Sequence, residues 1–153
     1  MTKTQEKTCR KRMCKRLHTV LTTNFESANL LTLEYANAIQ ASREFETKQY
    51  ASWLHLAKRI AGGSFEYVKI TEYGAEAAQL IRYRIITNLP EKTCEDLAES
   101  WFMGKATVEH LDPAQLAGIA ESVRTLPAAG REKFRRTWST SHYLSRPASA
   151  LCS

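Results

Sequence analysis

Two neighbouring stretches decide the fold: FEYVKITE at residues 65–72 and LIRYRIIT at residues 80–87. Apolar and polar side chains alternate along the first stretch, which is typical of a β-strand with one buried face. The segment Tyr73–Glu76 lies between them, contains a glycine and predicts a turn. We therefore expect the two stretches to be strands that pair as a β-hairpin.

Further helices and strands are predicted on both sides of this hairpin. The expected elements are a helix over 5–23, a strand over 30–35, a helix over 42–61, a helix over 92–102, a strand over 105–110 and a helix over 112–125. Gly62-Gly63 ends the second helix, and Asp112 followed by Pro113 begins the last one. This order predicts an α+β fold with a mainly antiparallel sheet and with helices packed on one of its faces.

Length and composition favour one folded domain over residues 1–153. Hydrophobic residues make up 43% of the chain and charged residues 25%, which excludes a disordered or fibrous protein. No apolar run approaches the roughly 20 residues of a membrane span, and the N-terminus lacks the apolar region of a secretory signal. We expect a protein of the bacterial cytoplasm with no membrane partner. None of the four cysteines has zinc-ligand spacing, so we expect structural thiols.

Positive charge is concentrated in two segments. The net charge is +6, and residues 1–16 alone account for it, so the remainder of the chain is neutral. A second basic cluster follows residue 130 and has a tryptophan beside it, a combination that suits single-stranded nucleic acid. Such segments attract polyanions. The predicted nucleic-acid-binding residues are Arg10, Lys11, Arg12, Lys15, Arg16, Arg131, Lys133, Arg135, Arg136 and Trp138.

Five stretches resemble, in order and spacing, motifs of the rolling-circle replication initiators of small phages and plasmids, which are members of the HUH endonuclease superfamily. These stretches are Leu30–Tyr35, Phe65–Gly74, Trp101-x-x-Gly104, Gly118–Ala120 and Arg136–Ser141 with Leu144 and Pro147. The resemblance implies a ferredoxin-like βαββαβ core over 28–127, preceded by a basic helix (1–23) and followed by a basic tail (128–153).

The chemistry of that family is missing from the matching positions. Its members hold a divalent cation with two histidines on one strand and a carboxylate on the next, and a tyrosine attacks the DNA phosphodiester. Here the histidine positions correspond to Arg82 and Arg84, the carboxylate to Glu72 and the tyrosine to Ser122. A guanidinium is always protonated and repels a cation. We therefore expect no bound metal, no other cofactor and no nicking activity.

Two interpretations of the arginine pair stay open at this point. Arg82 and Arg84 could form a cross-strand ion pair with Glu72 that only stabilises the sheet. They could instead form a phosphate clamp at the place where relatives of this protein hold their cation.

The predicted function is that of an inactive initiator-like protein. It would bind single-stranded DNA or RNA, or a nucleoprotein complex, through the basic helix and the basic tail, mainly by phosphate contacts. One alternative is an anti-defence inhibitor of a mobile element, similar to an anti-CRISPR protein, that binds a host nuclease or its guide-bound form. A second alternative is a metal-dependent endonuclease that nicks single-stranded DNA.

Overall fold

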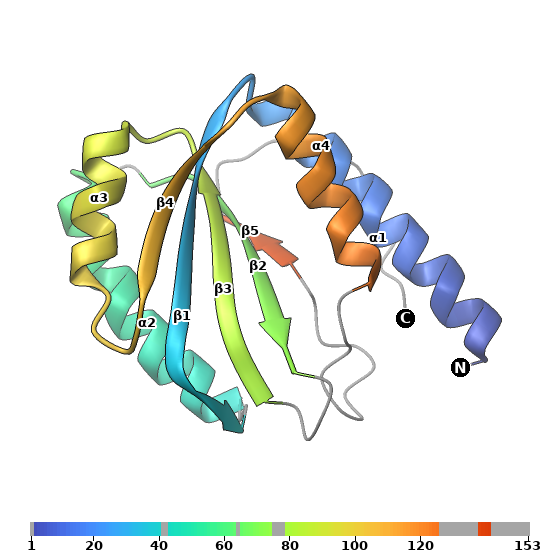
Figure 1. The fold of residues 1–153 in the computed structure, drawn as a ribbon, viewed down its shortest axis with the longest axis horizontal. Helices are drawn as coiled ribbons and strands as arrows, with labels where there is room; N and C mark the ends of the chain where they lie inside the picture. The colour runs from blue at the N-terminus through green and yellow to red at the C-terminus, as the bar shows by residue number, and fades with distance from the viewer. Residues whose placement is uncertain (1, 41–42, 64, 75–78, 126–137, 142–153) are drawn as a thin grey trace.

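Figure 1 shows a β-sheet with helices packed against it. This computed structural model describes residues 2–40, 43–63, 65–74, 79–125 and 138–141. The elements are α1 (Lys3–Asn24), β1 (Ala28–Gln40), α2 (Arg43–Ile60), β2 (Tyr67–Tyr73), β3 (Gln79–Thr87), α3 (Glu91–Ser100), β4 (Ala106–Leu111), α4 (Pro113–Ser122), a 3-10 turn η1 (Val123–Thr125) and β5 (Trp138–Thr140).

The predicted hairpin is confirmed and lies inside a five-stranded antiparallel sheet. Strands β2 and β3 pair with Lys69 opposite Ile85 and Glu72 opposite Arg82. The strand order is β4-β1-β3-β2-β5. The segment from β1 to β4 therefore has the ferredoxin-like βαββαβ arrangement, with α1 added before it, and the expected α+β class is confirmed.

Helices cover both faces of the sheet, so the expectation that they pack on one face is wrong. Helices α2 and α3, which connect β1 to β2 and β3 to β4, do share a face, but α1 and α4 cover the other one (Figure 1). The reason is visible in the central strands: Ile85 and Ile86 point to opposite faces and both are fully buried. A sheet that is apolar on both sides needs a cover on each.

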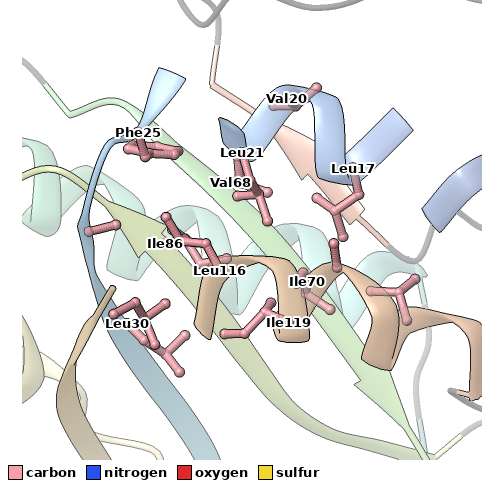
Figure 2. Close-up of a cluster of buried hydrophobic side chains, with 14 residues drawn as sticks. Leu17, Val20, Leu21, Phe25, Leu30, Val68, Ile70, Ile86, Leu116 and Ile119 are labelled. Atoms are coloured by element: carbon pink, nitrogen blue, oxygen red, sulfur yellow. The ribbon is translucent and has the colours of Figure 1, made fainter. Parts of the chain in front are cut away.

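The core between the sheet and helices α1 and α4 positions the candidate site. Leu17, Val20 and Leu21 of α1 pack with Leu116 and Ile119 of α4 and with strand side chains such as Val68 and Ile70 (Figure 2). On the other face the core is largely aromatic; its larger members are Tyr35, Tyr50, Trp53, Tyr67, Tyr73, Tyr83 and Trp101. Helix α1 is thus held on one side only, and its opposite side faces solvent.

The end of α2 and the start of α4 lie where the sequence predicts them. Gly62 and Gly63 follow α2 with φ angles of 78° and 92°, a conformation that favours glycine. Asp112 caps α4: its side chain accepts a hydrogen bond from the Gln115 backbone at 2.8 Å, and Gln115 Oε1 accepts one from the Asp112 backbone at 2.9 Å.

Strand β5 is an element that the sequence analysis missed. Trp138–Thr140 lie in the stretch assigned to the basic tail, yet they pair with β2 at one edge of the sheet. Ser141 reinforces this pairing, because its backbone N–H donates to the Tyr67 carbonyl at 2.9 Å and its Oγ accepts from the Tyr67 N–H at 2.8 Å. Three residues are too few to produce a strand pattern in a sequence.

Candidate nucleic-acid interface

Helix α1 has one apolar face and one basic face. Cys14, Leu17, Val20 and Leu21 are buried against α4 and the sheet. The opposite side carries exposed basic side chains; these are Lys7, Lys11, Arg12 and Lys15. The buried face fixes the rotation of the helix about its axis, and so it fixes which cations point to solvent.

Lys7, Lys11 and Lys15 follow one another at four-residue spacing and form a stripe along α1. Residues four apart on a helix are neighbours, so the stripe brings like charges together at a cost of roughly 0.2–0.5 kcal/mol per pair. Within the described part of the chain, none of the three forms an ion pair with a carboxylate. Sequence reasoning did not assign Lys7 to the site, although its spacing from Lys11 was the signal that would have found it.

The other predicted residues of α1, Arg10 and Arg16, are less exposed to solvent. Arg10 is half-buried, and its guanidinium donates to the Arg124 carbonyl at the end of η1 over 3.5 Å. Arg16 is also half-buried. These two arginines therefore lie beside the contact between α1 and the body, while Lys11, Arg12 and Lys15 form the exposed face.

The predicted C-terminal half of the interface is only partly described. Arg131, Lys133, Arg135 and Arg136 lie outside the described residues. Trp138 is described: it is half-buried in β5 and packs against the core that α1 covers. Part of its ring is therefore used to hold β5 on the sheet.

Glu72, Arg82 and Arg84, which the resemblance assigns to a former metal site, come together in the structure. Glu72 Oε1 lies 3.1 Å from a terminal nitrogen of Arg84, and Glu72 Oε2 lies 2.9 Å from Arg82 Nε. The Arg82 N–H is not aligned for a hydrogen bond, so this contact is an ion pair only. Glu34 of β1 completes the network at 3.1 Å from Arg82. Sequence reasoning missed Glu34, because its neighbour across the sheet depends on the strand order.

Ser122 at the end of α4 joins this network. Arg84 donates a hydrogen bond to Ser122 Oγ at 3.1 Å, and the Ser122 hydroxyl donates to the Ile119 carbonyl at 2.6 Å. The hydroxyl proton is thus directed at a backbone oxygen. The network links the last turn of α4 to β2 and β3, and so it helps to hold α4 on the sheet.

The network is balanced in charge. Two guanidinium groups face two carboxylates, and burial lowers the pKa of Arg84, while Glu72 opposes that shift. The guanidinium stays protonated, because its ordinary pKa is far above neutral. A phosphate would have to displace Glu72 to bind both arginines. This arrangement favours the ion-pair interpretation over the phosphate clamp.

The described cysteines are free thiols: Cys9, Cys14 and Cys94. The described residues contain no group of three His, Cys, Asp or Glu side chains that could hold a metal ion. Burial, assisted by the charge of Glu91, raises the pKa of Cys94 to about 11.

The raised pKa of Cys94 predicts slow alkylation. At pH 8 only about one thiol in a thousand is ionised, and the thiolate is the reactive form. In a variant with the other three cysteines replaced by serine, we expect Cys94 to react with iodoacetamide only in urea. The pKa of Cys94 in the folded protein is higher than the usual 9.0. Ionisation of this thiol therefore lowers the free energy of unfolding as the pH rises from about 9 to 11. Rapid native labelling at pH 8 would contradict the burial seen here.

Within the described residues, no helix is long and apolar enough to cross a membrane. Comparison of the chain with protein-family models, curated proteins and solved structures finds no match. The resemblance to replication initiators therefore stays a prediction.

Proposed function

We propose that this protein binds nucleic acid, alone or within a nucleoprotein complex, through the exposed basic face of α1. The observation that carries the proposal is the stripe of Lys7, Lys11 and Lys15, which points to solvent beside Arg12 without a neutralising carboxylate among the described residues. Lysines and arginines on one helix face gain free energy from a polyanion by releasing its counterions.

The distribution of charged residues supports the same docking direction. Helix α3 lies on the side of the molecule opposite α1 (Figure 1) and exposes Glu91, Glu95 and Glu99 at four-residue spacing. The same side also exposes Lys58, Arg59 and Lys105, so its positive and negative charges largely offset one another, whereas α1 exposes an excess of positive charge. This local excess on α1 favours approach of the nucleic acid to that face.

The proposal includes the loss of nicking chemistry. The resemblance to replication initiators assigns Arg82 and Arg84 to the positions of the metal-binding histidines and Ser122 to the position of the tyrosine. The Ser122 hydroxyl donates a hydrogen bond to the Ile119 carbonyl and not to a basic side chain that could activate it. Incubation with Mn²⁺ and a labelled single-stranded oligonucleotide should give neither a cut product nor a covalent adduct; either product would restore the endonuclease alternative.

The direct test is the triple variant Lys7→Gln, Lys11→Gln and Lys15→Gln. We expect its affinity for a labelled 20-nucleotide probe to fall at least tenfold at about 100 mM salt, because three phosphate contacts are removed. The fold should persist, since all three side chains are exposed. Fluorescence anisotropy measures the affinity, and circular dichroism checks the fold.

A matched control separates local contacts from net charge. The variant Lys58→Gln, Arg59→Gln and Lys105→Gln removes the same charge from exposed positions on α2 and on the loop before β4. We expect its affinity to change less than threefold. Equal losses in the two triple variants would reject α1 as the interface. A protein partner that is captured from a host lysate after nuclease treatment, with no affinity for the probe, would favour the inhibitor alternative.

A further inference from the structure

The first two turns of α1 project beyond the other described helices and strands (Figure 1). All described side chains from Thr2 to Thr8 are exposed, and partial burial of α1 begins at Cys9. Figure 1 shows this end of α1 extending past the end of α4. Among the described residues, the projecting part thus exposes side chains on more than one side of the helix.

The projecting end is stabilised as a helix without support from the core. Thr2 and Gln5 form a capping box: Thr2 Oγ1 accepts from the Gln5 backbone at 3.1 Å, and Gln5 Oε1 accepts from the Thr2 backbone at 2.8 Å. A capping box satisfies two N–H groups that would otherwise lack partners and opposes fraying. The segment is therefore a short rod and not a loose tail.

The basic face lacks the aromatic side chains that single strands require. Sequence-independent binders of single strands stack bases on exposed aromatic rings. Helix α1 contains no Phe, Tyr or Trp. Trp53 and Trp101 are buried on the other face of the sheet, and Trp138 is partly covered in the core under α1. A rigid helix whose charged residues are all basic except Glu6 suits a double-stranded ligand better.

We propose that the projecting end of α1 enters the major groove of duplex DNA; this inference rests on the proposed function and specifies its ligand. A helix about 10–12 Å in diameter can lie lengthwise in this groove, which is about 12 Å wide. The projecting end of α1 and the turn after it, as far as Arg12, would make the contacts. The major groove of A-form RNA is too narrow for a helix.

The positions of the basic residues around the axis fit the two walls of a groove. At about 100° per residue, Lys7 and Arg12 are separated by roughly 140° around α1, with Lys11 between them. A helix lying in the groove would direct Lys7 to the phosphates of one strand and Arg12 to those of the other. Contacts of this kind position a protein without reading sequence.

Competition between nucleic acids tests this inference. Unlabelled duplex DNA, duplex RNA and single-stranded DNA with equal numbers of phosphates would displace a labelled DNA duplex at fixed salt. We expect duplex DNA to compete at least tenfold better than either alternative. Equal or better competition by single strands or by duplex RNA would overturn the groove assignment and leave the proposed function intact. Failure of every nucleic acid to bind would reject both.

A second measurement distinguishes groove entry from contact with the backbone alone. Thr8→Pro keeps every charge but interrupts the projecting turns, because proline lacks the N–H and clashes with the carbonyl four residues earlier. We expect unchanged thermal unfolding of the core, loss of the duplex preference and loss of protection of guanine N7 from dimethyl sulfate. If the variant retains the preference and the N7 protection, the inference is wrong.

Discussion

Replacing Gly104 by alanine should destabilise the protein by about 3 kcal/mol. A Cβ at this position would meet the Glu34 carbonyl oxygen inside van der Waals contact and would lie 2.6 Å from the backbone nitrogen of Ala36. The loop cannot move away easily. The carbonyls of Met103 and Lys105 accept hydrogen bonds from Ala36 and Glu34 of β1 at 3.0 and 2.8 Å.

The size of this effect follows from its two components. Overpacking against fixed backbone costs about 1–3 kcal/mol, and each hydrogen bond that loosens adds about 0.5–1.5 kcal/mol. For a chain of this length, a loss of 3 kcal/mol corresponds to a decrease in Tm of roughly 10 °C. Thermal unfolding followed by circular dichroism measures it.

Gly118→Ala is the matched control for Gly104→Ala. Gly118 lies within α4, and a Cβ there would meet no atom within 4 Å. Alanine is favoured over glycine in a helix by about 1 kcal/mol, so we expect this variant to be as stable as the parent or slightly more stable. If both variants lost the same stability, the close approach between Gly104 and β1 would not be the cause.

The second large effect is expected for Glu72→Gln, with a loss of about 2 kcal/mol. The Glu72 and Arg84 side chains are only 16% and 15% exposed, so removal of the carboxylate leaves a poorly solvated guanidinium without its charge partner. Breaking a fully buried pair costs about 3–5 kcal/mol and an exposed pair up to about 1 kcal/mol. The partial burial here places the expected value between those ranges. Urea unfolding gives the free energy.

Glu34→Gln makes the same chemical change at the exposed end of the network. Glu34 and Arg82 are 36% and 38% exposed, and Arg82 would keep its contact with Glu72. We expect a loss below about 1 kcal/mol. A larger loss for Glu34→Gln than for Glu72→Gln would show that the network is not centred on Glu72 and Arg84.

The sequence was sufficient to predict most of the fold because its signals are local. Alternation in residues 65–72 gave β2, Gly62-Gly63 marked the end of α2, and Asp112 marked the start of α4. Strand β5 and the second covered face of the sheet depend on contacts between distant segments. No pattern within three residues predicts that Trp138 lies opposite Ile70.

The candidate site was predictable in its composition and less so in its geometry. The excess of cations on α1 and the grouping of Glu72, Arg82 and Arg84 follow from helix and hairpin spacing. The half-burial of Arg10 depends on η1, and the contribution of Glu34 depends on β1 lying next to β3. The contact of Arg84 with Ser122 connects positions 38 residues apart and could not be seen in the sequence.

The central claim is that the exposed face of α1 makes contacts to phosphates. The salt dependence of DNA affinity tests this claim most directly. The logarithm of the association constant falls linearly with the logarithm of salt concentration, with a slope of about 0.9 per phosphate contact on duplex DNA. Between the parent protein and the Lys7→Gln, Lys11→Gln and Lys15→Gln variant, we predict that the slope becomes shallower by two to three, about one per lysine. The same slope for both proteins would contradict the account.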